Sequence, residues 1–422
     1  MGELESLISN VVVVGCGHIG LPLALALGEA GASVRGVEID PARLAALAGG
    51  RLDPDHEDMS RRLQGALGSG ALAFADAPGR STAPRTFILT VPTPVDGERR
   101  FVRGPLDRAV AAVTAVANAG DLIVVRSTVP IGTTRALAAG AADGLLWAAC
   151  PDRSVAGRAF ADQFEIPHLI GGLDDAADAA ARSVFSMLGE TRSVASPETA
   201  EAVKLFANAH RDVAFALANQ FALICEATGI DFAEVREAGS QGFARFSLAR
   251  AGPVGGPCLS KDLFLLAAPL ELAPVETDLL WSARNLNEGL ARRLCARVAA
   301  DLDASGAPRR AAVLGLAFKG RPAVSDRADS FGVAIAAALA ACDPPIAVTA
   351  WDPVSDPPAG RAAALAGASL VVLANDHPAL ADLSEIARAA PGAVVYDLCG
   401  ISDRGSAAGL ALRVFGDGTA RR

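Results

Sequence analysis

With 422 residues, of which 51% are hydrophobic and 20% charged, the chain has a globular composition and is long enough for two or three domains. The formal net charge of −9 argues against nucleic acid as the main partner, and no apolar run approaches the about 18 residues that span a membrane. Seven scattered cysteines without a C-x-x-C pair indicate reduced thiols in the cytoplasm, with no disulfide framework and no metal site.

A glycine-rich turn follows the first expected strand. Residues 11–14 are four valines, typical of a buried strand, and residues 21–29 have a helical pattern. Between them lie Gly15, Gly17 and Gly20, which form a G-x-G-x-x-G motif in the strand-to-helix context that dinucleotide binding requires. The turn would place a pyrophosphate at the helix N-terminus. The alternative is a glycine-rich turn in another fold. We expect Cys16 and His18 to line the turn rather than to take part in chemistry.

An acidic residue follows the second expected strand, residues 32–37. Glu38 lies 18 residues beyond Gly20, where a carboxylate accepts hydrogen bonds from the adenosine ribose hydroxyls. A carboxylate there repels a 2′-phosphate, so the sequence predicts NAD rather than NADP.

The next expected strands end in polar loops. Residues 86–91 precede Pro92 and Thr93, residues 122–125 precede Thr128, and residues 145–150 precede Asp152. Residues 168–172 resemble a last strand. This alternation with helices predicts a parallel sheet covered on both faces, with ligands at the carboxyl ends of its strands. Thr and Pro are also ordinary loop residues, which is the alternative interpretation.

A long helix is expected from Ser196 to Gly229, with Ser196 as its N-cap. Its length suggests that it joins two domains and packs against a second copy of the chain. Lys204 and Asn208 lie four residues apart and therefore share a face. Because Lys204 interrupts an apolar band, and a buried ammonium needs an anion, we interpret this face as part of a site rather than a solvated surface.

A cysteine in a glycine-rich bend follows the helix, in the sequence from Gly252 to Asp262. Cys258 is three residues before Lys261, and a nearby cation favours the nucleophilic thiolate. Gly255 and Gly256 permit unusual dihedrals and the close approach of a ligand. The alternative interpretation is a buried structural cysteine in an ordinary turn.

The last third restarts the strand–helix alternation. A helix is expected at 291–302, strands at 311–316, 348–351, 369–374 and 394–398, and an edge strand at 410–415. This predicts a second, smaller α/β domain without the G-x-G-x-x-G motif, which we assign to a nucleotide other than NAD.

Seven motifs in order resemble the UDP-glucose/GDP-mannose dehydrogenase family, and within it the UDP-N-acetylmannosamine dehydrogenase-like branch. They are GCGHIGLP at 15–22, VPTP at 91–94, STVPIGTT at 127–134, CPDR at 150–153, EAVKLFAN at 201–208, GGPCLSKD at 255–262 and GLAFKGRP at 315–322. The resemblance covers nearly the whole chain. It is specific for the family and much less so for the sugar.

The resemblance implies two successive oxidations of a nucleotide-sugar hydroxymethyl group to a carboxylate, with two NAD and no metal. Cys258 would trap the aldehyde as a thiohemiacetal, which is oxidised to a thioester and hydrolysed. Lys204 and Asn208 would stabilise the developing negative charge. Asp262 would position the hydrolytic water, and Thr128 and Asp152 would hold the water used in the first oxidation.

Binding residues are implied in the same way. The cofactor set is Gly15, Gly17, His18, Ile19, Gly20, Glu38, Asp40, Arg43, Pro92, Thr93, Thr128, Lys261 and Arg327. The substrate set is Arg153, Lys204, Asn208, Arg211, Gly255, Phe318, Lys319 and Arg321, of which Lys319 and Arg321 would meet a diphosphate.

The chain also departs from the family pattern. The family usually has Glu where this chain has Asp152, and often Pro where it has Ala156. The acid-Asn-Thr that often follows the lysine reads Ala207-Asn208-Ala209, and Arg327 stands one position early. These departures are compatible with a specialised substrate, such as a secondary-metabolite sugar, or with weakened activity.

The sequence therefore predicts an α/β protein with two Rossmann-like parallel-sheet domains, a long central helix and a small all-helical middle domain. We place an NAD-binding domain at 1–195, a central helical domain for catalysis and dimerisation at 196–298, and a nucleotide-sugar domain at 299–422. The predicted protein is a homodimeric nucleotide-sugar 6-dehydrogenase. The alternatives are a two-electron β-hydroxyacid or 6-phosphogluconate-type dehydrogenase, and an inactive nucleotide-sugar-binding homologue.

Overall fold

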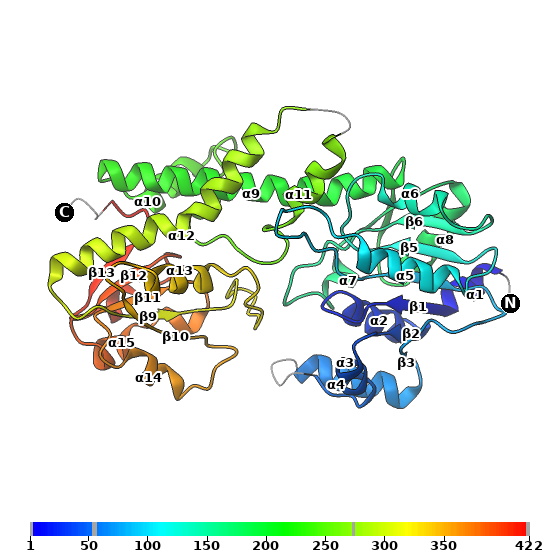
Figure 1. Cartoon of the computed structure of the whole chain (residues 1–422), viewed down its shortest axis with the longest axis horizontal. Helices are drawn as coiled ribbons and strands as arrows, with labels where there is room; N and C mark the ends of the chain where they lie inside the picture. The colour runs from blue at the N-terminus through cyan, green and yellow to red at the C-terminus, as the bar shows by residue number, and fades with distance from the viewer. Residues whose placement is uncertain (1–2, 53–56, 272–274, 419–422) are drawn as a thin grey trace. The chain divides into compact units, whose positions relative to one another are not determined.

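The structure is a computed structural model, and it describes residues 3–52, 57–271 and 275–418. The chain divides into two compact units, one of Met1–Ala207 with Lys261–Val275 and one of Asn208–Ser260 with Glu276–Arg422. Each unit is built around its own β-sheet (Figure 1). The domain boundaries expected at 195 and 298 remain predictions.

In the first unit, the described residues form an eight-stranded sheet in the order β3-β2-β1-β4-β5-β6-β7-β8. The strands are β1 (Asn10–Val14), β2 (Ser33–Val37), β3 (Leu72–Ala75), β4 (Thr86–Leu89), β5 (Leu122–Val125), β6 (Leu146–Ala149), β7 (His168–Gly172) and β8 (Thr191–Ser193). The strand order reverses between β1 and β4, which is where open α/β sheets bind dinucleotides.

One expectation about this sheet needs correction. The strand at 168–172 is present as β7, but it pairs antiparallel with β6, whereas the other neighbours pair in parallel. It is also not the last strand, because β8 follows it. The three residues of β8 are polar and at least partly exposed, so they carry no hydrophobic signal of a strand.

Helices cover both faces of the first sheet. On one face, Val11 and Val13 pack with residues of α2 (Gly20–Glu29) and α8 (Asp175–Phe185). On the other face, Val12 and Val14 pack with α5 (Gly104–Thr114) and α6 (Thr133–Ala139). The four valines of β1 are therefore buried on both sides, which explains their uninterrupted apolar run. Further helical segments of this unit are α1 (Glu3–Ser9), α3 (Pro41–Ala48), α4 (Glu57–Ser69), α7 (Asp162–Glu165), α11 (Asp262–Ala267) and the 3-10 turn η2 (Ala268–Glu271).

The second unit has a five-stranded parallel sheet in the order β10-β9-β11-β12-β13. Its strands are β9 (Arg310–Leu314), β10 (Ala347–Trp351), β11 (Leu370–Leu373), β12 (Val394–Asp397) and β13 (Ala411–Val414). One face packs on α12 (Asp278–Ser305) and α13 (Phe331–Ala340), and the other on α14 (Gly360–Leu365) and α15 (Ser384–Ala389). The remaining helical segments are α10 (Phe232–Ser240), η3 (Pro378–Leu380) and η4 (Arg404–Ser406). The expected edge strand is confirmed as β13.

The long helix is present as α9 (Pro197–Thr228), close to its expected limits (Figure 1). The helix expected at 291–302 is longer, because α12 begins at Asp278. The charged stretch at 54–67 also has a helical pattern in its sequence; residues 57–67 lie in α4, and residues 54–56 lie outside the described residues.

Candidate active site

The turn between β1 and α2 contains three motif glycines, two of which have no room for a side chain and one of which faces open space. Gly15 has a φ of +95°, and a Cβ added there would lie 3.1 Å from the carbonyl oxygen of Thr90. A Cβ on Gly20 would lie 1.8 Å from the carbonyl oxygen of Gly15, whereas one on Gly17 would meet nothing within 4 Å. The first and third glycines are therefore required by the turn itself, and the second faces open space where a ligand can approach.

Glu38 stands beside this turn at the end of β2. Its Oε2 accepts a hydrogen bond from the backbone N–H of Cys16 (3.3 Å), and its Oε1 accepts one from the N–H of Asp40 (3.0 Å). Arg43 donates to the carbonyl oxygen of Cys16 (2.8 Å) and lies 3.6 Å from the Glu38 carboxylate. The open glycine position and this adjacent carboxylate are the features that the pyrophosphate and ribose of NAD require, so the residues present fit that cofactor.

The other residues predicted around the cofactor have varied environments. Asp40 caps α3 by accepting from the backbone N–H of Arg43 (2.6 Å), His18 is exposed, and Ile19 occupies the N-cap position of α2. Thr90, which the sequence analysis did not single out, donates to the carbonyl oxygen of Gly15 (2.6 Å). Thr90 therefore ties the end of β4 to the glycine turn.

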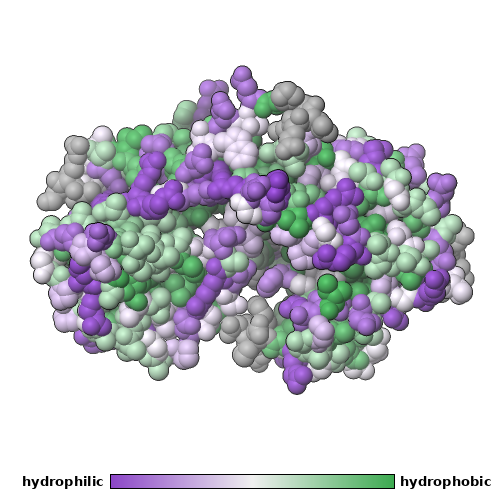
Figure 2. Space-filling view, in the orientation of Figure 1, coloured by the Kyte–Doolittle hydropathy of each residue, from purple (hydrophilic) through white to green (hydrophobic). Residues whose placement is uncertain are grey.

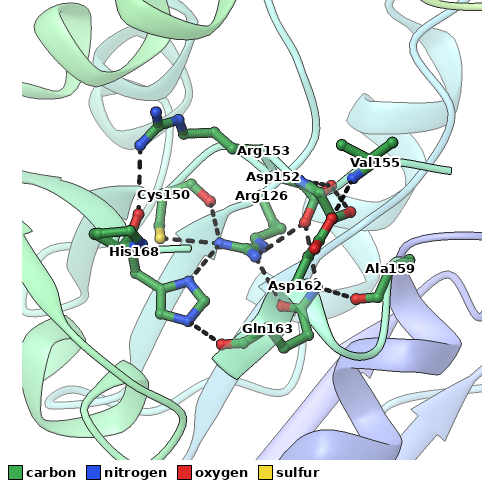
Figure 3. A network of polar contacts seen from close by, with 11 residues as sticks. Arg126, Cys150, Asp152, Arg153, Val155, Ala159, Asp162, Gln163 and His168 are labelled. Carbon is green, nitrogen blue, oxygen red and sulfur yellow. Dashed lines mark hydrogen bonds and ion pairs between the residues drawn. The ribbon is translucent and has the colours of Figure 1, made fainter. Parts of the chain in front are cut away.

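A buried guanidinium connects the ends of β5, β6 and β7 (Figure 3). Arg126 donates from Nη1 to the carbonyl oxygen of Cys150 (3.2 Å) and from Nη2 to Asp152 Oδ1 (3.0 Å) and Gln163 Oε1 (2.9 Å). Its Nη1 also lies 3.3 Å from His168 Nδ1. Arg126 and Asp152 have side chains only 3% and 8% exposed, so this is a buried ion pair with further hydrogen bonds.

The contacts of His168 define its protonation state. A guanidinium can only donate, so Nδ1 accepts from Arg126, and Nε2 donates to the carbonyl oxygen of Gln163 (2.9 Å). The imidazole is therefore neutral with its proton on Nε2. Burial, together with the charge of Arg126, lowers the pKa of His168 to about 4.

Asp152 is ionised in this setting. Burial by itself raises the pKa of Asp152, but the guanidinium of Arg126, hydrogen bonds from Ser154 and Gln163, and the charge of Lys204 hold that pKa below its ordinary value. Ser154 donates to Asp152 Oδ2 through both its hydroxyl (2.5 Å) and its backbone N–H (3.1 Å). The carboxylate has a fixed orientation because both of its oxygens accept hydrogen bonds.

Glu201 connects α9 to the loop that follows Thr128. This buried carboxylate accepts from the backbone N–H groups of Gly132 (2.6 Å) and Thr134 (2.8 Å) and from the Thr134 hydroxyl (2.6 Å). Lys204 lies one helical turn further along α9 and is half-buried. Glu201 thereby fixes the N-terminus of α6 against the helix that carries Lys204.

In the second unit, the loop of residues 252–260, hereafter the Cys258 loop, packs against Phe318 of the GLAFKGRP motif and against Asp329. Cys258 is the one exposed cysteine of the seven. A Cβ on Gly255 would lie 2.6 Å from the carbonyl oxygen of Asp329, and one on Gly256 would lie 2.5 Å from the Phe318 ring. These two glycines are required by close packing, in which Gly256 contacts Phe318 and Gly255 contacts the backbone of Asp329 and Phe331. The predicted substrate set of Gly255, Phe318 and Lys319 remains a prediction.

Lys261 pairs with its neighbour in the first unit. Its ammonium lies 2.7 Å from Asp262 Oδ1 and 3.5 Å from the hydroxyl of Thr93. Asp262 is almost fully buried at the start of α11. The sequence analysis did not anticipate that the charges of Lys261 and Asp262 pair with each other.

The remaining predicted residues lie as follows. Asn208 is buried on α9, Thr128 is half-buried and Pro92 is exposed, while Arg153, Arg211 and Arg321 are exposed. Arg327 donates to Asp356 Oδ1 (2.7 Å) and to the hydroxyl of Ser355 (2.6 Å) in the second unit.

Two family models match the chain. Residues 9–189 match the NAD-binding domain of the UDP-glucose/GDP-mannose dehydrogenase family, and residues 198–289 match its central domain. A UDP-N-acetyl-D-mannosamine dehydrogenase of Pyrococcus horikoshii is 32% identical over 324 residues, which are 74% of this chain and 76% of the relative. The chain belongs to the UDP-glucose/GDP-mannose dehydrogenase family.

Full-length similarities agree with this assignment. A UDP-N-acetyl-D-mannosamine dehydrogenase of Methanococcus maripaludis is 27% identical, with 97% of this chain and 98% of the relative covered. A solved structure of the Pyrococcus horikoshii enzyme has a TM-score of 0.85 at 28% identity, with 97% and 99% of the two chains covered. The protein is therefore an NAD-dependent oxidoreductase of the nucleotide-sugar dehydrogenase type, and both predicted sheets are confirmed.

Two features are absent from the described residues. None of their helices has the length and apolar character to cross a membrane. None of their His, Cys, Asp and Glu side chains gather in a group of three or more that could hold a metal ion.

Proposed function

We propose that the protein oxidises the 6-hydroxymethyl group of a UDP-hexose or UDP-N-acetylhexosamine to a carboxylate, with two NAD consumed per sugar. The observation that carries this proposal is Cys258, the one exposed cysteine of seven, on a loop packed against Phe318 and Asp329. The names of the relatives support an N-acetylated sugar.

The proposed reaction has two oxidations and one covalent intermediate. NAD accepts the hydride in each oxidation. The first oxidation converts the alcohol to an aldehyde, and the Cys258 sulfur then adds to the aldehyde carbon to form a thiohemiacetal. The second oxidation gives a thioester, and water cleaves its C–S bond to release the carboxylate and the thiol. One alcohol, one water and two NAD⁺ thus yield one carboxylate, two NADH and three protons.

The polar residues on α9, at the ends of β5 and β6, and at the start of α11 have separate roles in this proposal. Lys204 and Asn208, four residues apart on α9, stabilise the alkoxide and the oxyanion. Asp152 is held ionised by Arg126, so it acts as a hydrogen-bond acceptor that orders a water together with Thr128. Its ion pair explains how a side chain one methylene shorter than the usual Glu can keep a fixed position. Asp262 positions the hydrolytic water.

The substrate diphosphate would meet the second sheet. Lys319 and Arg321 follow β9, at the carboxyl ends of parallel strands, where α/β sheets bind ligands. We assign the sugar nucleotide to this position because the strand-to-helix turn after β9 lacks the glycine motif found after β1.

A second part of the proposal is a homodimer through α9. Leu217, Ile224 and Ile230 are 44%, 48% and 49% exposed, and the first two lie seven residues apart on one face of the helix. Figure 2 shows hydrophobic residues gathered over α9 and α10 on this face of the second unit. An exposed apolar stripe of this kind is typical of an interface. The predicted cytoplasmic location also remains a proposal.

The substitution Cys258→Ser tests the covalent mechanism. A serine hydroxyl is a much weaker nucleophile than a thiolate, so we expect folded protein with net acid formation reduced by about three orders of magnitude or more. Carboxylate product is measured by mass spectrometry after incubation with UDP-N-acetyl-D-mannosamine and NAD, and with UDP-glucose, GDP-mannose and dTDP-glucose in parallel. Normal acid production by the variant would refute the thioester.

Two controls sharpen this experiment. Cys342→Ser changes a half-buried cysteine of the second unit and is expected to keep wild-type activity. The ratio of NADH formed to sugar consumed separates the candidate functions in the wild-type protein. It is two for the proposed reaction, one for a two-electron dehydrogenase, and undefined for an inactive homologue, which consumes no sugar.

A further inference from the structure

The Cys258 loop is held at both ends by one continuous set of buried polar side chains. The backbone N–H of Gly252 donates to Asn219 Oδ1 (2.7 Å), and Asn219 Nδ2 donates to Asn287 Oδ1 (3.2 Å). Asn287 Nδ2 donates to Asp212 Oδ1 (2.8 Å), which also accepts from Arg284 Nη1 (2.9 Å). Arg284 Nη1 then donates to the carbonyl oxygen of Leu259 (2.8 Å).

These four side chains, Asn219, Asn287, Asp212 and Arg284, are hereafter the polar bridge. Their exposed fractions are 0%, 1%, 4% and 2%, so each hydrogen bond is shielded from water. Asn219 and Asp212 come from α9, and Asn287 and Arg284 from α12. The bridge therefore links two helices to the residues at either end of the segment that contains Cys258.

The hydrogen bonds of the polar bridge have one possible direction. The N–H of Gly252 can only donate, which orients the oxygen of Asn219 towards it. The carboxylate of Asp212 can only accept, which orients the amide nitrogen of Asn287 towards it. The orientations of the Asn219 and Asn287 side-chain amides are therefore both determined. Replacing Asn219 by Asp removes its donor to Asn287 and so interrupts the series of hydrogen bonds, while the shape of the side chain is preserved.

Two further contacts hold the middle of the loop. The backbone N–H of Gly256 donates to the carbonyl oxygen of Asp329 (3.0 Å), and the Ser260 hydroxyl donates to Asp329 Oδ2 (2.7 Å). Asp329 itself has a φ of +50°, a left-handed conformation that is uncommon for a residue other than glycine. Strained residues persist where the surroundings enforce them, and they cluster at functional sites.

We propose that Asn219, Asn287, Asp212 and Arg284 are positioning residues that hold the Cys258 thiol in the geometry required for attack on the substrate aldehyde. The proposal rests on the function assigned to Cys258 above. The polar bridge itself does not touch the reacting atoms. It acts by fixing the backbone at Gly252 and Leu259, and Cys258 lies between these two residues in the chain.

The isosteric variant Asn219→Asp tests this proposal. The new carboxylate still accepts from Gly252 but cannot donate to Asn287, so the bridge is interrupted. We expect faster amide hydrogen exchange in the peptide that covers residues 252–260. With UDP-N-acetyl-D-mannosamine and NAD, we expect kcat to fall about ten- to a hundredfold while KM for the sugar nucleotide changes less than about twofold. Arg284→Lys, which keeps the charge but loses the planar fork, is the second variant.

A readout without substrate makes the test independent of the proposed function. We expect the rate at which iodoacetamide alkylates Cys258 to differ at least about threefold between each variant and the wild type, because the surroundings of the thiol change. Should Cys258→Ser retain acid formation, the exchange and alkylation results still decide whether the bridge fixes the loop.

Glu226→Gln is the matched control. Glu226 is also a buried carboxylate on α9 of the second unit, but it accepts from the N–H of Gly416 (3.1 Å) and pairs with Arg297, neither of which belongs to the Cys258 loop. This variant is expected to be less stable, with unchanged kcat, loop exchange and alkylation. Equal changes in the control, or unchanged loop exchange and alkylation in both bridge variants, would overturn the proposal.

Discussion

At the scale of single residues, burial and the charge of Arg126 together set the charge state of two neighbours. Burial, together with Arg126, keeps His168 neutral, while Arg126 and further hydrogen bonds hold Asp152 ionised against the effect of its burial (Figure 3). The sequence predicted Asp152 as a site residue but not Arg126, Gln163 or His168 as its partners. The sequence around an arginine or histidine that flanks an apolar strand does not show whether its side chain is a buried partner or an ordinary loop residue. The pairing of Arg126 with Asp152 and His168 depends on strands that become neighbours only in the folded protein.

The neutral state of His168 makes stability depend on pH. The unfolded chain takes up a proton at this residue near its ordinary pKa of 6.5, whereas the folded protein does so near 4. Acid therefore favours unfolding between these two values, and the loss amounts to roughly 3 kcal/mol across the window. Urea unfolding at pH 4.5, 5.5 and 7 measures this loss.

His168→Gln is the matched variant. A glutamine can accept from Arg126 and donate to the Gln163 carbonyl oxygen, but it does not titrate. Between pH 7 and pH 4.5, we expect the free energy of unfolding to fall less for this variant than for the wild type. The difference between the two losses should be close to the loss that the titration of His168 causes over this pH range. Parallel pH profiles of the two proteins would contradict the assigned neutral imidazole.

At the scale of elements, hydrophobic periodicity predicted β1, β4, β5, β7 and α9 close to their observed bounds, because these elements bury continuous or periodic apolar runs. The first half of α12 was missed for a specific reason. Arg284 and Asn287 are fully buried there, so the inward face of the helix carries polar residues. A helix that builds a polar bridge lacks the apolar stripe by which sequence reasoning recognises helices.

Glu201 provides a test of how α9 holds a loop of the first sheet. We expect Glu201→Gln to cost about 1–3 kcal/mol, because the side-chain amide presents donors to the N–H groups of Gly132 or Thr134. Amide exchange of residues 127–134 should accelerate.

The control lies three residues earlier on the same helix. Glu198 pairs with Arg135, whose side chain is 54% exposed, and surface pairs contribute about 1 kcal/mol at most. We therefore expect Glu198→Gln to leave the exchange of residues 127–134 unchanged. Similar exchange in the Glu201 and Glu198 variants would show that the buried carboxylate does not hold the loop.

At the scale of the whole molecule, composition and motif order predicted two α/β sheets and the family, and both are confirmed. Motif order succeeded because each motif is local, so its residues are adjacent in the chain. The polar bridge was not foreseen because its contacts join residues up to 75 positions apart, as between Asp212 and Asn287.

The proposed homodimer is tested with two charges on its apolar stripe. We expect the wild-type protein to elute with twice the chain mass in size-exclusion chromatography with light scattering. Leu217→Glu combined with Ile224→Glu should give the mass of one chain, because burying two carboxylates at an interface is strongly unfavourable. Val333→Glu changes an equally exposed valine on α13 and should remain dimeric. A wild-type monomer would contradict the proposal.

The exposure of Cys258 has a consequence for chemical selectivity. The other six cysteines are buried or half-buried, and burial raises the pKa of Cys16, Cys150, Cys225, Cys295 and Cys399. An electrophile in solution therefore meets a single competitive target in the native protein. A covalent inhibitor or a spectroscopic label would modify that one position without prior removal of the remaining thiols.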